Sequence, residues 1–290
     1  MSNKHATLLL KLVVSGSLLT YLASTLDWKQ VAKLDIIFLA ILPVGLLLGL
    51  FFLTFMAARW KILVEMQSIK KFSFAEAYRG YLIGAFFSIF MPGAIGGDLL
   101  RIKYCLDVCN IGIKTAGLVV VTERVFGLAA LAILFSIGVS IGYDFFSILE
   151  LEWVSTVVAI SISTLSISTL IFWLSRHIHI KSKYILLLLL LSAAGQMTDI
   201  VIAYIVLHTI STPLPFITLL FVMPLVYVAT VLPISIGGLG VREGVLSGLL
   251  VLFGVEYSTA VISAFMMYFV KVLIGLVGLP VFLRTRNEII

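Results

Sequence analysis

Apolar segments long enough to cross a bilayer recur along the whole chain, and they constrain its fold more than any other feature. A helix needs about 20 predominantly apolar residues to cross the hydrocarbon core, and several runs here approach or exceed that length. Of the 290 residues, 61% are hydrophobic and only 12% are charged, whereas a soluble domain of this size needs a far more polar surface. The sequence therefore predicts an all-α polytopic membrane protein, with residues 1–290 forming a single integral membrane domain.

Six segments are suited to full spans, at about 7–26, 34–58, 114–141, 153–175, 184–208 and 259–283. The first could also be a signal peptide, but Lys11 interrupts its apolar run, so an uncleaved span is preferred. The connection that follows the second span, beginning at Arg59, is the most basic long one, and basic loops are typically cytoplasmic. We therefore expect both termini on the cytoplasmic side of the plasma (inner) membrane.

Two further apolar segments, with motifs at 80–101 and 216–243, are broken by proline and paired glycines. Loop charges place both flanks of the first segment in the cytoplasm and both flanks of the second outside. Each segment is therefore predicted to be a re-entrant pair of half-helices that enters and leaves on one side. Irregular backbone at membrane depth is tolerated only where protein buries it or water reaches it, so two such segments predict a cavity.

The two broken segments share the pattern Pro-x-x-Ile-Gly-Gly-x-x-x-Arg, at residues 92–101 and 233–242, with a constant offset of 141 residues. Three predicted spans separate them, an odd number, so the copies should have opposite orientations and form an inverted repeat. The alternative is a chance similarity between two glycine-rich turns. Paired Gly/Pro-interrupted segments in inverted repeats are the best sequence indication of a transporter's binding site.

Several polar groups lie inside the predicted spans: Glu123, Arg124, Gln196, Asp199 and Lys271. An ionisable group at a helix centre costs about 2.5–3.5 kcal/mol on insertion scales. Adjacent side chains on a helix point about 100° apart, so Glu123 and Arg124 each need a partner elsewhere. These groups either pair across helices and fix the packing, or line a polar path between the leaflets.

The Gly-Gly pairs with their arginines suggest an anion site. Glycines before a helix start expose backbone N–H groups at the positive end of the helix dipole, and an arginine one turn later adds a fork for phosphate oxygens. We expect no metal or cofactor. His177 and His179 lie in a basic turn where lipid contact is the preferred interpretation, and Cys105 and Cys109 are interpreted as ordinary small apolar residues.

Three segments, "MPGAIGGDLLR", "VVVTERVFGL" and "LPISIGGLGVREG", resemble in this order the signature segments of the lysylphosphatidylglycerol synthase transmembrane (flippase-like) family. The resemblance covers about residues 7–285 and implies a multi-span membrane protein that moves lipids between leaflets. The residues that match the family's motif positions, and that are expected to bind substrate, are Gly96, Gly97, Asp98, Arg101, Glu123, Arg124, Gly237, Gly238, Gly240, Arg242 and Glu243.

The predicted function is therefore a lipid flippase for an anionic or phosphate-linked lipid, of phospholipid or polyprenyl-phosphate type. Gln196, Asp199 and Lys271 would line its polar pathway. The aminoacyl-transferring members of the family carry a soluble C-terminal domain, and the chain stops at Ile290 after its last span. We therefore expect no enzyme activity from it alone.

Two alternatives stay open. One is a non-catalytic accessory subunit that holds a separate synthase or glycosyltransferase. The other is an intramembrane enzyme with Glu123 or Asp98 as its base. The expected partners are membrane lipids rather than nucleic acid, because the excess of lysine and arginine lies beside the spans.

Overall fold

The computed structural model describes residues 36–90, 95–141, 180–210, 214–231 and 238–289, together with short stretches between 13 and 24 and between 161 and 173. All regular secondary structure in these residues is helical, as the sequence predicts. The predicted spans at 7–26 and 153–175 lie largely outside the described residues, and His177 and His179 lie wholly outside them.

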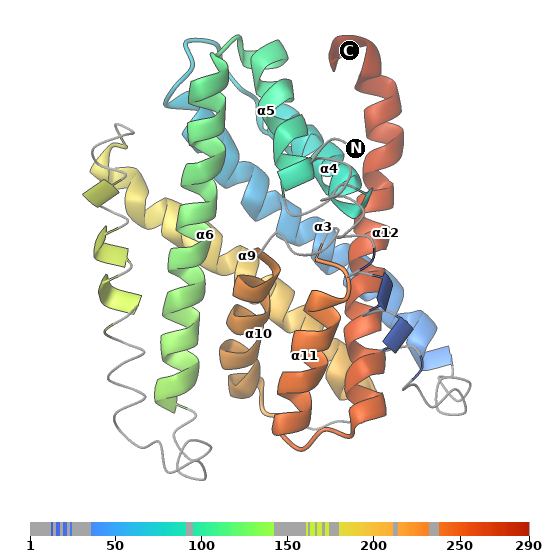
Figure 1. The fold of residues 1–290 in the computed structure, drawn as a ribbon. Helices are drawn as coiled ribbons and strands as arrows, with labels where there is room; N and C mark the ends of the chain where they lie inside the picture. Colours follow the sequence, from blue (N-terminus) through green and yellow to red (C-terminus); the bar gives the residue numbers. More distant parts are fainter. Residues whose placement is uncertain are drawn as a thin grey trace.

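Four long helices form the frame of the bundle (Figure 1): α3 (Ile36–Glu65), α6 (Ile113–Ile141), α9 (Ser182–Thr209) and α12 (Tyr257–Ile289). Among the described residues, these four are long and apolar enough to cross a membrane. They match the predicted spans at 34–58, 114–141, 184–208 and 259–283 closely, except at the end of α3.

The end of α3 corrects the sequence prediction, which placed Arg59 in a loop. The helix continues to Glu65, so Arg59 lies within it. The following residues Trp60, Leu63 and Val64 are completely buried. Packing against neighbouring helices therefore extends α3 beyond the point where its purely apolar composition ends.

Each predicted broken segment is a pair of short helices. The first pair is α4 (Phe74–Phe90) and α5 (Ile95–Cys109), and the second is α10 (Phe216–Val231) and α11 (Val241–Leu252). These helices have 17, 15, 16 and 12 residues, fewer than the roughly 20 that a full crossing needs. We refer to the two pairs as the first and second hairpins.

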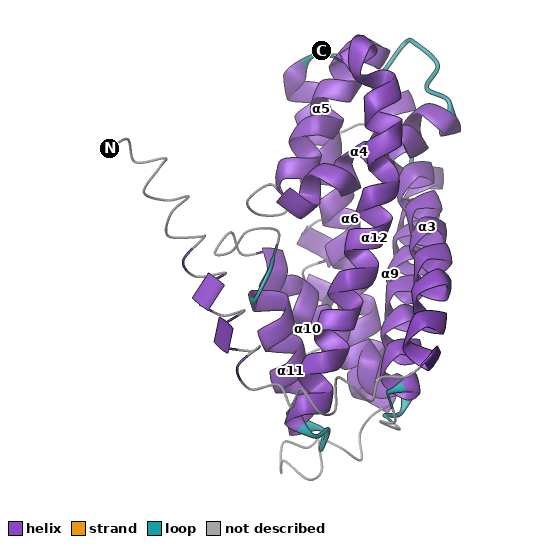
Figure 2. Cartoon of the chain, turned by 90° about the vertical axis from the view of Figure 1, so that its right-hand side faces the viewer, coloured by secondary structure: helices purple, strands orange, loops and turns teal. Residues whose placement is uncertain are grey.

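The two hairpins enter the bundle from opposite ends. In Figure 1 the α4–α5 pair extends to one end, the α10–α11 pair extends to the other, and the ends at which each pair is joined lie near mid-height. Figure 2 shows the same division of the bundle's length from the side. Both broken segments are thus pairs of short helices that extend to opposite ends of the bundle, and their re-entrant course through a membrane stays a prediction.

Proline and glycine account for where the hairpin helices end and begin. Helix α4 ends at Phe90, two residues before Pro92, whose ring removes a backbone donor and disfavours helix in the preceding residue. Helix α11 begins after Gly238 and Gly240, which have φ values of 82° and 84°. Only glycine adopts this left-handed region without a steric penalty.

Glycines also allow the helices to approach closely. A Cβ atom on Gly278 of α12 would lie 2.0 Å from the carbonyl oxygen of Leu82 on α4. Within the first hairpin, a Cβ on Gly97 would lie 2.4 Å from the carbonyl oxygen of Gly84. Small residues at helix contacts in membranes let backbones meet and gain van der Waals contact. Gly278 thus allows α12 to pack closely on α4, and Gly97 allows α5 to pack closely on α4.

We predict that Gly278→Ala destabilises the folded protein by about 1–3 kcal/mol, the usual range for overpacking, because the added methyl group meets backbone that cannot move aside. The matched control is Gly117→Ala on α6, where nothing lies within 4 Å of the added Cβ. Thermal unfolding in detergent should show a lower apparent Tm for Gly278→Ala only. Equal unfolding temperatures for the two variants would contradict the close contact between α4 and α12.

Candidate functional site

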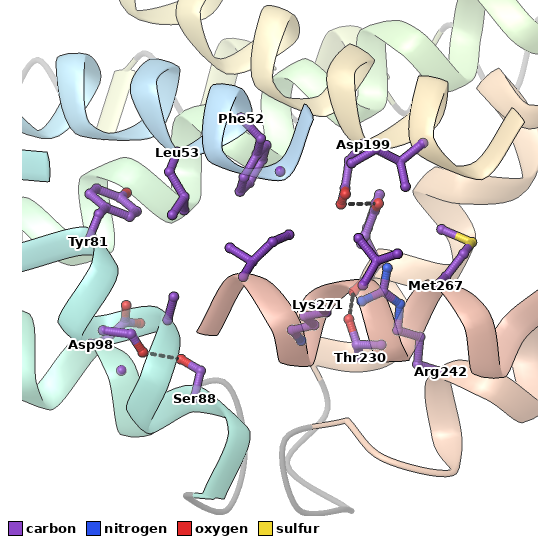
Figure 3. A pocket seen from close by; sticks show the side chains of 18 of the residues that line it. Phe52, Leu53, Tyr81, Ser88, Asp98, Asp199, Thr230, Arg242, Met267 and Lys271 are labelled. Carbon is purple, nitrogen blue, oxygen red and sulfur yellow. Dashed lines mark hydrogen bonds between the residues drawn. The ribbon is translucent and has the colours of Figure 1, made fainter. Parts of the chain in front are cut away.

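A cavity of about 310 Å³ lies between the two hairpins and the long helices (Figure 3). Apolar side chains of α3 and α12 form part of its wall, among them Phe52, Leu53 and Val270. The polar side chains that line it are Tyr81, Ser88, Asp98, Arg101, Asp199, Tyr227, Thr230, Arg242 and Lys271. A cavity is thus present where the sequence predicts one, with polar groups from both hairpins.

The first hairpin presents Asp98 and Arg101 to the cavity, both from the start of α5. Arg101 Nη1 donates to Asp98 Oδ1 at 3.3 Å. Arg124 of α6 donates to the other oxygen of the same carboxylate, from Nε at 2.7 Å and also from Nη2. Asp98 therefore bridges two arginines, one from each helix.

Glu123 is the centre of this network and is only 1% exposed. Its Oε1 accepts hydrogen bonds from Tyr81 Oη at 2.8 Å and from Arg59 Nε at 3.4 Å, and its Oε2 accepts one from Arg101 Nη2. Arg59 also donates to Ser192 Oγ at 2.8 Å. The predicted need of Glu123 for partners outside its own helix is confirmed.

We refer to Arg59, Asp98, Arg101, Glu123 and Arg124 as the arginine cluster. Each charged group in it has an ion-pair partner within the cluster. Arg101 is further held by aromatic rings, with its Cζ 3.9 Å from the Tyr81 ring centroid and 4.5 Å from that of Trp60. Cation–π contact of this kind stabilises a desolvated guanidinium. Each charged group of the cluster thus has a partner of opposite charge in the chain, although three guanidinium groups against two carboxylates leave one net positive charge.

The opposite side of the cavity is built differently. Figure 3 shows Asp199, Thr230 and Arg242 on one side of the cavity and Tyr81 and Asp98 on the other. Arg242 is 7% exposed. Within the described part of the chain, no carboxylate lies within salt-bridge distance of Arg242 or of Lys271. Two cations therefore face the cavity without an ion pair.

Tyr227 of α10 organises this second side. Its hydroxyl donates to Asp199 Oδ2, and its ring lies 5.7 Å from Arg242 Cζ. Asp199 comes from α9, Arg242 from α11 and Lys271 from α12, so three helices in addition to α10 converge on this wall. We refer to Asp199, Tyr227, Arg242 and Lys271 as the open side of the cavity.

Glu243, for which the sequence predicts substrate binding, lies in the first turn of α11. Its Oε2 accepts a hydrogen bond from the backbone N–H of Gly240 at 2.6 Å, the reciprocal contact of a capping box. Gly238, Gly240 and Glu243 are absent from the cavity wall and shape the start of the helix. Gly237 lies outside the described residues.

The remaining predicted residues divide between packing and the cavity. Gly96 and Gly97 lie in the first turn of α5; both are buried, and Gly97 reaches the cavity wall. Gln196 Nε2 lies beside Gly127 together with Arg59, so it faces α6 rather than the cavity. The structure thus brings Asp98, Arg101, Asp199, Arg242 and Lys271 together around one space, and it places Glu123, Arg124 and Gln196 behind its wall.

Three important residues were missed from the sequence. Arg59 was assigned to a loop, although the apolar residues that follow it continue the helical pattern of α3. Tyr81 and Tyr227 carry hydroxyl groups inside otherwise apolar half-helices, and each donates to a carboxylate, that of the buried Glu123 and that of the partly buried Asp199. The sequence feature that could have indicated these two residues is a tyrosine within a proline- or glycine-interrupted apolar helix.

Metal-binding geometry does not appear in the described residues. They contain no group of three or more His, Cys, Asp or Glu side chains that could hold an ion. Cys105 and Cys109 are free and buried, and they belong to an apolar cluster that also contains Trp60 and Phe72. They pack as apolar residues.

We predict that Glu123→Gln lowers the free energy of unfolding by about 3–5 kcal/mol, because the buried Arg59 loses its carboxylate partner and Arg101 loses one of its two. The control is Glu65→Gln, which removes an exposed pair between Glu65 and Lys61 at 2.7 Å and should change stability by about 1 kcal/mol at most. Unfolding of the two variants in a denaturing detergent measures the difference. Similar losses of stability would show that the arginine cluster does not hold the helices together.

Comparison with known proteins gives one result. No curated protein matches the chain. The family model of the lysylphosphatidylglycerol synthase TM region matches residues 8–278, which include both hairpins, the arginine cluster and the open side. This match extends over nearly the whole chain, so it identifies an integral membrane protein and confirms the resemblance seen in the motifs. The chain belongs to the lysylphosphatidylglycerol synthase TM region family.

Proposed function

We propose that the protein is a lipid transporter that binds an anionic, phosphate-containing head group in the cavity and moves the lipid between leaflets. The observation that carries this proposal is the pair of cations on the open side. Arg242 and Lys271 face a cavity without an ion-pair partner among the described residues. An uncompensated buried charge is strongly destabilising, so an anionic ligand would relieve this cost.

The side chains and helices around the cavity indicate the type of ligand. Arginine binds phosphate oxygens through a planar fork, and lysine binds them as a compact charge. The helices around the cavity are long and apolar, which suits a ligand with acyl or polyprenyl chains that remain in the bilayer. The family is named for the membrane region of a synthase of a phospholipid, which also supports a lipid ligand.

Transport rather than simple binding is supported by the arrangement of the hairpins. They carry the same Pro-x-x-Ile-Gly-Gly-x-x-x-Arg pattern, enter from opposite ends and meet near mid-height (Figure 1). We interpret them as the two copies of an inverted repeat. In transporters with such repeats, the site lies at the repeat interface and opens alternately to each side.

The proposal contains no chemical step, so the protein is treated as a transporter and not as an enzyme. Its ligands are lipids of the plasma (inner) membrane, with a separate synthase or glycosyltransferase as a possible supplier of substrate. Loop charges support cytoplasmic positions for both termini.

The test is transport of labelled lipids in vesicles that contain only the purified protein. We expect wild-type protein to move an anionic phospholipid and expect Arg242→Ala and Lys271→Met each to slow transport by about tenfold or more, since each removes a charged contact to the phosphate. Lys103→Ala is the control, because Lys103 is an exposed residue of α5 outside the cavity wall.

Each variant must first show wild-type helical content and an unchanged elution volume. Equal transport rates for the Lys103→Ala control and the Arg242→Ala variant would show that transport does not depend on the open side. A folded wild-type protein that moves no lipid of any class would overturn the transporter and favour an accessory subunit for a synthase or glycosyltransferase.

A further inference from the structure

We infer that Asp199 is a positioning residue that takes the place of the ligand's anion when the cavity is empty. In a second, closed conformation its carboxylate pairs with Arg242 and Lys271, much as the carboxylate of Glu123 pairs with arginines in the arginine cluster. The inference rests on the proposed function and specifies how the cavity returns without a ligand. The arrangement described above is the open one.

Two sets of four helices, α3 to α6 and α9 to α12, are built alike. Each consists of a long helix, a hairpin of two short helices and a second long helix. Their mutual contacts correspond, since α12 packs on α4 and α6 packs on α10. Asp199 follows Arg59 by 140 residues, and Arg242 follows Arg101 by 141. We therefore treat these residues as corresponding positions of the two sets.

The first set contains a closed unit of three side chains, Tyr81, Arg101 and Glu123. The Tyr81 hydroxyl donates to Glu123 Oε1 at 2.8 Å, and the Tyr81 ring centroid lies 3.9 Å from Arg101 Cζ. Arg101 also forms an ion pair with Glu123, which is 1% exposed. The tyrosine, the arginine and the carboxylate are thus all in mutual contact.

The second set contains the same three kinds of group in an opened arrangement. Tyr227 donates to Asp199, and its ring centroid lies 5.7 Å from Arg242 Cζ. Asp199 and Arg242 are not within salt-bridge distance, and both line the cavity (Figure 3). Lys271 lies on the last helix of this set, as Glu123 does in the first. Closing this unit therefore brings Asp199 toward two cations.

The second hairpin has room for such a movement, whereas the first does not. A Cβ on Gly97 of α5 would lie 2.4 Å from backbone of α4. In the described part of the chain, nothing lies within 4 Å of a Cβ added to Gly244 or Gly248 of α11. Helix α11 can therefore shift against its neighbours and carry Arg242 toward Asp199.

Asp199 is the carboxylate of the cavity wall that is suited to this role. The other, Asp98, accepts hydrogen bonds from Arg101 and Arg124 at its two oxygens. Within the described residues, Asp199 is held by one neutral hydroxyl. A buried charge without a partner is strongly destabilising. An empty cavity therefore favours the closed arrangement, and a bound anion favours the open one.

The first experiment measures ion pairing without transport. It compares the apparent Tm of Lys271→Met in lipid-free detergent in two backgrounds, wild type and Asp199→Asn. In the wild type we expect a decrease of about 4 °C or more, because a pair is broken. In Asp199→Asn, where Lys271 already lacks its partner, we expect no decrease. The same shift in both backgrounds would overturn the inference.

Short-chain phosphatidylglycerol at saturating concentration provides a control for the same comparison. The lipid phosphate then occupies the cations in place of Asp199, so the difference between the two backgrounds should disappear. A difference that persists at full strength in the presence of bound lipid would show a fixed contact rather than an exchange of partners, and would contradict the inference.

The second experiment compares net movement with exchange in vesicles. For net movement, labelled phosphatidylglycerol is added to the outer leaflet of phosphatidylcholine vesicles, so the cavity must return empty. For exchange, unlabelled phosphatidylglycerol is present in both leaflets, so the cavity can return loaded. In Asp199→Asn we expect the ratio of net movement to exchange to fall about tenfold or more, because the empty cavity cannot close on its cations.

Two further variants separate this role from a general loss of fold, which would slow both rates alike. Asp199→Glu keeps the carboxylate and should restore the ratio. Asp107→Asn, at an exposed residue of α5 outside the cavity wall, should leave the ratio unaltered.

The outcomes distinguish this inference from the proposed function. An unchanged ratio in Asp199→Asn would overturn the inference while the transporter stands. Wild-type protein that moves no lipid in either arrangement would overturn the transporter, and the Tm comparison would then decide whether Asp199 closes on the cations.

Discussion

The rest of the structure depends on compensation of the buried charge of Glu123. This carboxylate, on α6, is bound by Arg59 of α3, Arg101 of α5 and the hydroxyl of Tyr81 of α4, so one side chain joins four helices. Lipid offers no partner to such groups, and each would be expensive alone. The arginine cluster thereby holds the first hairpin in the bundle and directs the start of α5 toward the cavity.

The two sides of the cavity meet the same constraint in different ways. In the arginine cluster every charged group has an ion-pair partner in the chain. On the open side, Arg242 and Lys271 lack an ion pair within the described residues, and Asp199 is bound by a neutral hydroxyl. The first side is therefore held together by ion pairs, whereas the second has two cations without one among the described residues. The shared sequence pattern of the hairpins conceals this difference, because Arg101 and Arg242 occupy the same motif position.

The sequence could predict features that depend on neighbouring residues, but not contacts between residues far apart in the chain. Helix ends near Pro92 and Gly240 follow from local backbone chemistry, and they are confirmed. The burial of Glu123 also followed from its place in an apolar run. The partners of Glu123 and Arg124 did not, because Arg59 is 64 residues from Glu123 in the chain and Asp98 is 26 from Arg124. Glu243 differs, since its capping contact with Gly240 is local and could have been predicted from the sequence. Its predicted contact with substrate stays a prediction.

The cap that Glu243 provides has a consequence for how this protein family can diversify. The backbone N–H of Gly240, just before α11, is bound by the chain itself, and the polar groups that line the open side of the cavity are side chains. Backbone amides present the same donors whatever the residue, whereas side chains can be exchanged one at a time. A scaffold of this kind can keep its hairpins and its glycine contacts while a few substitutions on the open side change the head group that it accepts.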